Sequence, residues 1–185
     1  MSKETYHGYI WTTADAILLF EACRQGLLPR VQHRLSKKEQ NSIESGSVFV
    51  WDEEETGIKR WTDGKLWSKS NRISGSLHVY KEQELWADKT PDSRRGSDED
   101  QEMDDDGADR YRYRDKQDGL IKLSFIIKTS KGQHLHLISY LRSHADSPRL
   151  PKPTTDPGLC HIKPVKGMYP EPMVRGPWMT TPNAL

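Results

Sequence analysis

The stretch "LIKLSFIIKTSKGQHLHLISYL", residues 120–141, decides which fold this chain can adopt. Two runs rich in leucine, isoleucine and phenylalanine flank the Lys131–Gly132 pair, and this pattern predicts two antiparallel strands joined by a tight turn. An isolated hairpin is at best marginally stable in water. We therefore expect the hairpin to share its core with elements from the first half of the sequence.

The first half begins with a predicted helix. Apolar side chains recur at the spacing of a buried helical face at Ala16, Leu19, Phe20 and Cys23. Thr12 or Thr13 is placed to cap this helix, and Pro29 prevents its continuation beyond Gly26. The helix is long enough to cover one face of a small sheet.

Shorter elements follow the helix. Ser36 and Glu39 have capping-box spacing and predict a short second helix. Residues rich in β-branched and aromatic side chains predict strands over 47–53 and near 77–82. These elements are too few for two independent cores. The sequence therefore predicts a single domain of the α+β class, mostly antiparallel β-sheet with an amino-terminal helix, built from two interleaved blocks.

The remaining residues lack the composition of a folded core. Hydrophobic residues make up 34% of the 185-residue chain and charged residues 30%, which is a low apolar share for a globular protein. Residues 87–118 hold almost no aliphatic side chains, and we predict a disordered acidic linker there. The two blocks of the domain are then residues 1–86 and 119–157, and an extended proline-rich tail follows at 158–185.

The charge is distributed unevenly along the chain. The formal net charge of +1 combines a net of −6 over residues 83–118 with a net of +6 over residues 119–185. This asymmetry favours a polyanionic partner. Cys23 and Cys160 form no CxxC pair, which favours a reducing compartment. The sequence has neither a long apolar run nor an apolar signal region, so we expect no membrane association.

The segment "GIKRWTDGKLWSKSNRI", residues 57–73, is the strongest candidate for a binding site. It places five basic residues beside Trp61 and Trp67 in a stretch that predicts a turn. Lysine and arginine neutralise phosphates, and arginine enters the narrow minor groove of A·T-rich DNA. A neighbouring glycine such as Gly57 lets the backbone approach the groove. The same composition also fits a solvated loop with two half-buried tryptophans.

Several stretches resemble the WOPR domain, the DNA-binding module of fungal transcriptional regulators that control white–opaque switching and dimorphism. They are "GYIWTTADAILLFEAC", "LPRV", "SGSVFVWDEEETGIKRWTDGKLWS", "GLIKLSFII" and "HLHLISYL". The resemblance covers residues 6–82 and 119–157. It implies a sequence-specific, fungal, nuclear transcription factor that binds double-stranded DNA as a monomer. We also expect transcriptional co-regulators as partners, and we expect neither a cofactor nor a metal.

The resemblance also implies roles for individual residues. It places Arg60 in the minor groove of an A·T-containing site and Lys59 and Lys65 near phosphates. The other predicted DNA-binding residues are Gly57, Thr62, Ser68, Arg72, Arg30 and Arg34. The basic residues before Thr62 also match a site for a basophilic kinase, and a phosphate there is expected to weaken DNA binding.

Three other functions remain to be weighed. A zinc site would use His134, His136, Cys160 and His161, but no pair among them has zinc-ligand spacing. An enzyme would need carboxylates at a fixed separation, whereas the acidic residues lie in a turn at 52–55 and in the predicted linker, so we expect no catalytic residues. A protein-interaction module whose basic loop binds acidic peptides is the alternative function.

Overall fold

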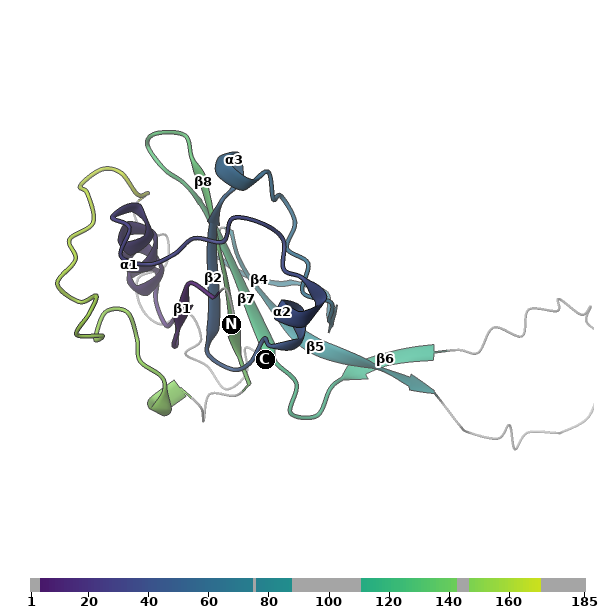
Figure 1. Cartoon of the computed structure of the whole chain (residues 1–185). Helices are drawn as coiled ribbons and strands as arrows, with labels where there is room; N and C mark the ends of the chain where they lie inside the picture. Colours follow the sequence, from purple (N-terminus) through teal and green to yellow (C-terminus); the bar gives the residue numbers. More distant parts are fainter. Residues whose placement is uncertain (1–3, 75, 88–110, 143–146, 171–185) are drawn as a thin grey trace, which may run out of the picture.

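One antiparallel sheet forms the body of the molecule. The computed structural model describes residues 4–74, 76–87, 111–142 and 147–170. The strands are β1 Tyr6–His7, β2 Ser47–Asp52, β3 Leu66–Trp67, β4 Asn71–Ser74, β5 Leu77–Ala87, β6 Tyr111–Asp115, β7 Ile121–Lys128 and β8 His134–Leu141. They form one eight-stranded sheet in the order β1–β2–β8–β7–β5–β3, with β4 and β6 also paired to β5 (Figure 1). The predicted α+β class and antiparallel sheet are confirmed.

Short helices accompany the sheet. They are α1 Thr13–Arg24, α2 Lys37–Asn41, α3 Glu53–Thr56 and the 3-10 helix η1 Ser147–Arg149. The predicted caps are present, because the Thr12 side chain accepts a hydrogen bond from the Asp15 amide and the Ser36 side chain accepts one from the Glu39 amide. None of the described helices has the length and apolar character needed to cross a membrane.

The predicted hairpin is present as β7 and β8, and it lies at the centre of the sheet. Its register pairs Ile121 with Leu141 and Lys128 with His134. On its outer sides β8 pairs with β2, and β7 pairs with β5. The hairpin of the second block therefore lies between strands of the first block in one sheet. Neither block holds a complete core, so the prediction that the two blocks share one core is confirmed.

Side chains alternate between the two faces of the sheet, and α1 covers the first face (Figure 1). Val48, Val50, Leu123 and Leu137 belong to one apolar cluster with the buried side of α1. The helix residues predicted to face the core are all buried: Ala16, Leu19, Phe20 and Cys23. The helical spacing in the sequence therefore identified the correct buried side.

Loops and short helices cover the second face. The buried residues on this side are Val31, Leu35, Ile43, Phe49, Trp51, Ile58, Leu120, Ile138 and Tyr140. Because α2 and α3 are only about one turn long, this cover is not a helix that packs as a unit. Its position depends on individual hydrogen bonds and ring contacts. The segment predicted to bind DNA is part of this cover.

The linker prediction was wrong at both ends of the segment. β5 continues through Ala87 and pairs with β6, with Leu85 opposite Tyr113, so both ends continue the sheet as a two-stranded ribbon (Figure 1). Tyrosine has high β-propensity, and Arg114 pairs with Glu84 across the two strands at 2.7 Å. Composition does not reveal that these charges are paired across two strands, and for that reason the segment was predicted to be disordered. Residues 88–110 lie outside the described part of the chain.

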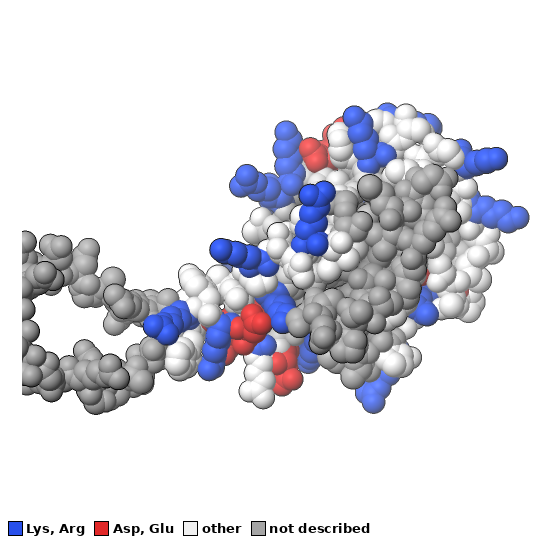
Figure 2. Space-filling model, turned by 180° about the vertical axis from the view of Figure 1, so that it is seen from behind, with Lys and Arg blue, Asp and Glu red and all other residues white. Residues whose placement is uncertain are grey.

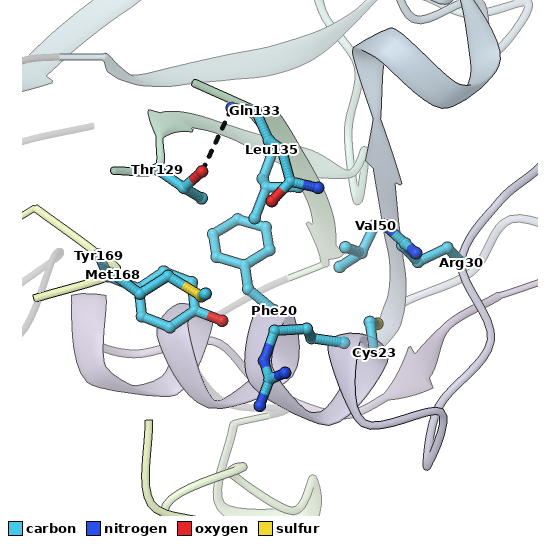
Figure 3. Close-up of a pocket in the computed structure, with 10 residues that line it drawn as sticks. Phe20, Cys23, Arg30, Val50, Thr129, Gln133, Leu135, Met168 and Tyr169 are labelled. Carbon is cyan, nitrogen blue, oxygen red and sulfur yellow. Dashed lines mark hydrogen bonds between the residues drawn. The ribbon is translucent and has the colours of Figure 1, made fainter. Parts of the chain in front are cut away.

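The prediction of an extended tail was wrong for residues 158–170. Leu159, Ile162 and Met168 are buried, and the first two belong to the cluster around α1. The carboxy-terminal segment, residues 147–170, lies along the outer side of α1 (Figure 1). Met168 and Tyr169 line a recess of about 20 Å³ together with Phe20 of α1 (Figure 3). Residues 171–185 lie outside the described part of the chain.

Acidic side chains bind this segment to the rest of the domain. The amide and hydroxyl of Thr154 donate to Asp15, and the Tyr6 hydroxyl donates to Asp156. The Tyr169 hydroxyl donates to Glu21 at 2.7 Å. Hydrogen bonds from the Arg24 guanidinium, supported by Gln25 and Tyr169, outweigh burial and lower the pKa of Glu21 to about 2. Glu21 therefore remains an ionised acceptor down to low pH.

We expect Leu159→Ala to lower the free energy of unfolding by about 2–5 kcal/mol, because Leu159 is only 5% exposed and truncation leaves a cavity. Val165→Ala is the matched control, because Val165 lies in the same segment and is 43% exposed, and it should change stability by less than about 0.5 kcal/mol. Urea denaturation followed by circular dichroism measures both. Equal effects would contradict the placement of this segment in the core.

Candidate nucleic-acid interface

The basic loop, residues 57–67, begins where α3 ends. The Asp52 carboxylate caps α3 by accepting a hydrogen bond from the Glu54 amide at 3.0 Å. Gly57 then ends the helix in the left-handed conformation, with φ of 68°, which glycine adopts without steric cost. A Cβ added to Gly57 would meet no atom within 4 Å. Backbone conformation therefore explains this glycine within the domain.

Contacts with Trp51 fix the loop on both sides of Lys59 and Arg60. The buried Trp51 indole donates from Nε1 to the Ile58 carbonyl at 2.8 Å. Its ring also stacks on the Trp61 ring, with centroids 4.8 Å apart and an angle of 18° between planes. Lys59 and Arg60 are exposed between these two fixed positions, and neither cationic group forms a hydrogen bond or ion pair with another described residue.

The Asp63 carboxylate connects the loop to the sheet. Asp63 is only 5% exposed, and its oxygens accept from Trp67 Nε1 at 2.9 Å, Tyr140 Oη at 2.7 Å and Lys122 Nζ at 3.1 Å. Tyr140 in turn accepts from Trp61 Nε1 at 2.7 Å. Both tryptophans of the loop are thus bound, directly or through Tyr140, to one carboxylate.

Asp63 also shapes the turn of the loop. Its carboxylate accepts from the Lys65 amide at 3.2 Å, which is the hydrogen bond of an Asx-turn. Gly64 has φ of 71°, and a Cβ there would lie 2.6 Å from Gln40 Oε1 of α2. The left-handed backbone conformation therefore favours glycine at this position. The turn predicted within residues 57–73 is present at Asp63–Gly64.

The electrostatics of this network favour an ionised Asp63. Burial alone would raise the pKa of Asp63, but the charge of Lys122 and the hydrogen bonds from Trp67 and Tyr140 outweigh it, so the pKa lies below its ordinary value. Burial lowers the pKa of Lys122, and Asp63 opposes that effect. The Lys122 ammonium also lies 4.2 Å from the centre of the Trp67 ring, which favours its charged form.

An open groove separates the loop from the sheet. We call it the aromatic groove; its volume is about 370 Å³, and its lining residues are Trp51, Lys59, Arg60, Trp61, Trp67, Ser68, Tyr80, Lys122, Ser124, Ile126, His136 and Ile138. The residues from β5, β7 and β8 lie on one sheet face, because the register pairs Tyr80 with Lys122 and Ile126 with His136. Three of the predicted DNA-binding residues, Lys59, Arg60 and Ser68, therefore lie together here.

The other predicted residues have different surroundings. Arg34 supports the loop, because its guanidinium donates to the Arg60 carbonyl at 2.9 Å and to the Thr62 hydroxyl at 3.2 Å. The side chain of Thr62 is exposed. Arg30 lies apart from the groove lining and pairs with Asp52 at 3.5 Å and Glu55 at 3.2 Å.

Lys65 and Arg72 lie at the edge of the interface. The Lys65 ammonium lies 3.7 Å from the Glu82 carboxylate and is directed towards the base of the β5–β6 ribbon. Arg72 is exposed on β4, and its Cα is paired with that of His78 on β5. His78 in turn pairs with Ser124 of the groove lining. The register thus places Arg72 on the same sheet face as the groove.

Two histidine–glutamate contacts hold α3 against β8. His134 Nδ1 lies 2.7 Å from Glu54 Oε1, and His136 Nε2 lies 2.8 Å from Glu53 Oε2. The His136 ring also stacks on Trp51, with centroids 4.7 Å apart. Within the described ranges, no group of three or more histidine, cysteine and acidic side chains is placed to hold a metal ion. His134 and His136, two of the residues considered for zinc, thus hold α3 at the start of the loop.

Sequence reasoning missed the sheet residues that line the aromatic groove or hold the loop. The missed residues are Tyr80, Lys122, Ser124, Ile126 and Tyr140. Lys122 carried a usable signal, because a lysine within an apolar strand needs a buried acidic partner. The others carried none, because the face to which a strand residue points depends on how the sheet is covered.

Seen from behind the view of Figure 1, basic side chains outnumber acidic ones on the visible described surface (Figure 2).

Comparison with known proteins finds relatives along most of the chain. The model of the Gti1/Pac2 family matches residues 5–111. The cAMP-independent regulatory protein pac2 of Schizosaccharomyces pombe is 43% identical, over 97% of this chain and 88% of that protein. The global transcription regulator sge1 of Gibberella moniliformis is 51% identical, over 44% of this chain. The match spans only 25% of the length of sge1.

Two solved structures are similar in fold. The complex of the WOPR domain of Wor1 in Candida albicans with a 13-base-pair double-stranded DNA has a TM-score of 0.63 at 32% identity, covering 90% of this chain and 94% of that chain. The complex of the same domain with a 17-base-pair double-stranded DNA has a TM-score of 0.60 at 29% identity, covering 89% and 95%. The similarity therefore extends over nearly the whole domain.

We expect Asp63→Asn to lower the free energy of unfolding by about 3–5 kcal/mol at neutral pH, because it leaves the buried Lys122 ammonium without its counter-charge. The pKa of Asp63 is depressed in the folded state. Its contribution is therefore present above about pH 4 and is lost as the pH falls through the folded value. The difference between wild type and variant should shrink below about pH 4.

Asp115→Asn is the matched control for this substitution. Asp115 pairs with Lys81 at the surface, and exposed pairs contribute less than about 1 kcal/mol. Chemical denaturation across a pH series measures both variants. If Asp63→Asn were no more destabilising than Asp115→Asn, the buried carboxylate would not hold the loop to the sheet.

Proposed function

The chain belongs to the Gti1/Pac2 family, and on this premise we propose that its folded domain binds double-stranded DNA with sequence specificity as part of a fungal regulator of transcription. The resemblance to the WOPR domain is confirmed by the comparisons with solved structures. Two of these neighbours are complexes with double-stranded DNA, and relatives are named transcription regulators. Membership of this family confirms the prediction that the chain is not an enzyme.

One observation carries the proposal: the exposed Lys59–Arg60 pair is held between fixed positions at Ile58 and Trp61. A side chain presented by a rigid loop loses less conformational freedom on binding than one on a mobile loop. The minor groove of A·T-rich DNA is narrow and strongly negative, and it favours an inserted guanidinium. We therefore propose that Arg60 enters the minor groove of an A·T-containing site.

Neighbouring residues are proposed to contact the phosphate backbone. Lys59 and Ser68 line the same groove as Arg60, and Arg72 lies on the same sheet face. Contacts of this kind fix the position of a protein on the duplex without reading bases. One nitrogen of the Arg34 guanidinium donates to the Arg60 carbonyl of the loop, and its other N–H groups can donate to a phosphate. For Arg30 we propose a smaller part, because two carboxylates already pair with it.

Thr62 is proposed as a site at which phosphorylation regulates DNA binding. Thr62 lies two residues after Arg60 in the loop, and its side chain is exposed. Its hydroxyl accepts a hydrogen bond from the Arg34 guanidinium. A phosphate there would add about −1.5 to −2 charges. That charge would repel the DNA backbone and compete for the Arg34 guanidinium. Binding to DNA should therefore weaken.

The cellular setting follows from the proposed activity. A regulator that binds chromosomal DNA acts in the nucleus, and we propose that localisation for this protein. We further propose that one copy of the domain binds each site and that transcriptional co-regulators bind elsewhere on the protein. The Lys59–Arg60 tip and its supports all come from one chain, so binding needs no second copy to complete the loop.

We expect Arg60→Ala to weaken binding to a selected duplex by about 1–3 kcal/mol, because it removes the proposed minor-groove contact. The unfolding midpoint should stay unchanged, because the Arg60 guanidinium binds no described residue. Lys163→Ala is the matched control: it also removes one exposed positive charge, but from the carboxy-terminal segment that lies along α1. Titration of a labelled duplex by fluorescence anisotropy measures both.

The duplex for this titration comes from in vitro selection out of a random pool. A sequence-specific domain should prefer the selected duplex over a scrambled one by ~10³-fold or more. Equal binding of both duplexes would contradict the proposed function. An equal loss from Arg60→Ala and Lys163→Ala would contradict the role of Arg60 while leaving DNA binding itself in place.

A further inference from the structure

The floor of the aromatic groove is chemically unlike a surface for duplex DNA. Its lining includes the rings of Trp61, Trp67 and Tyr80 and the aliphatic side chains of Ile126 and Ile138. The outer surface of B-form DNA presents phosphates and sugars, and its base edges lie within grooves. A rigid duplex that receives Arg60 in its minor groove therefore offers no apolar side group that fills a recess beside that residue. The proposed DNA contacts use the rim of the groove and leave its floor unoccupied.

The size and lining of the groove are those of a binding site. Its volume of about 370 Å³ lies within the roughly 300–1,000 Å³ of typical ligand pockets, which combine apolar and aromatic walls with a few polar groups. Besides Lys59 and Arg60, the polar groups here are the hydroxyls of Ser68, Ser124 and Tyr80, the Lys122 ammonium and the His136 ring. Tyr80, Ser124 and Ile126 are only half-buried, so the loop leaves this part of the sheet face uncovered.

The charges around the groove are mainly positive. Lys59 and Arg60 lie in its wall, and both are exposed without an acidic partner among the described residues. The acidic groups nearby are already engaged: Asp63 is buried against Lys122, and Glu53 contacts His136. A ligand that complements this site must therefore combine an apolar group for the floor with negative charge for the rim.

We propose that the aromatic groove is a second binding site, which takes a short acidic peptide segment of a partner protein that carries a bulky apolar side chain. The apolar side chain fills the space above Ile126 and Ser124, between Tyr80 and the tryptophans. Carboxylates on either side of it then pair with Lys59 and Arg60. A buried apolar core surrounded by a polar rim is the usual arrangement of protein interfaces.

This arrangement has a consequence for the DNA-binding residues. The peptide and the duplex would both use Lys59 and Arg60, so they cannot bind at the same time. An acidic partner segment would therefore compete with DNA for the domain. The apolar floor, in contrast, would be used by the peptide alone, and this difference separates the two binding modes in an experiment.

The probe is a fluorescein-labelled peptide of aspartate and glutamate residues with phenylalanine and leucine at its centre. A control peptide has serine at the two central positions. We expect the first peptide to bind the 185-residue chain at least ~10-fold more tightly than the second, because only the first fills the apolar floor. Equal binding of the two peptides, or no binding of either, would overturn the proposal.

Ser124→Leu tests the position of the site, because it fills the floor of the groove from β7 and touches none of the proposed DNA contacts. We expect it to weaken the phenylalanine peptide by ~10-fold and to leave affinity for the selected duplex within about 2-fold. Equal weakening of peptide and duplex would assign the groove to the DNA interface and overturn the proposal.

A second variant covers the case in which Ser124→Leu perturbs folding, which its unfolding midpoint reports. Lys59→Glu reverses an exposed charge at the rim and should weaken the peptide by ~10-fold or more, whereas Lys163→Glu in the carboxy-terminal segment should have no such effect. Equal effects of the two charge reversals would overturn the proposal. The peptide titrations do not require DNA binding. If the wild-type protein bound the phenylalanine peptide but no duplex, that result would contradict the proposed function and leave the peptide site in place.

Discussion

The carboxylate of Asp63 is the point on which the geometry of the interface depends. Its oxygens accept hydrogen bonds from Trp67, Tyr140 and Lys122, and the Tyr140 hydroxyl in turn accepts one from Trp61. The sheet is held by its own backbone ladder and by α1, but the loop cover has no comparable framework. A buried ion pair is costly to form, and removing one partner is more costly still. The loop therefore has one well-defined position on the sheet.

This fixed position links the fold to the proposed activity. Trp51 holds the loop from the side of β2, Asp63 holds it from the turn, and Arg34 holds the backbone of Arg60 itself. The cationic tip is thus ordered before any partner arrives, which lowers the entropic cost of binding. The same supports keep the aromatic groove open beside the tip. The proposed recognition of DNA and the proposed recognition of an acidic peptide therefore depend on one scaffold.

Local sequence signals predicted the local structure well. Of the two predicted caps of the first helix, Thr12 or Thr13, the structure uses Thr12, and Ser36 caps the second helix as predicted. The β7–β8 hairpin was predicted from its apolar runs and the Lys131–Gly132 turn. The exposure of the Lys59–Arg60 pair was also predicted, because basic residues beside tryptophans in a turn are rarely buried in a core. What these features share is that neighbours in the sequence determine them.

Interactions between distant residues escaped prediction. Asp63 was expected in a turn, but its bonds to Lys122 and Tyr140 span 59 and 77 residues. Leu159 and Ile162 lie in a proline-rich segment without periodicity, and they are buried because that segment lies along α1. β6 looked too polar to fold, because its charges are paired only across the ribbon. Each of these depends on a partner that no local pattern reveals.

The most direct measurement is the ratio of affinities for a selected and a scrambled duplex, determined for wild type and for Asp63→Asn at a temperature where both are folded. If the carboxylate fixes the tip, the variant should keep its salt-dependent, non-specific affinity, which depends on charge alone. Its preference for the selected duplex should fall towards that non-specific level. A folded variant that retained the full wild-type ratio would contradict the claim that Asp63 positions Arg60 for reading DNA.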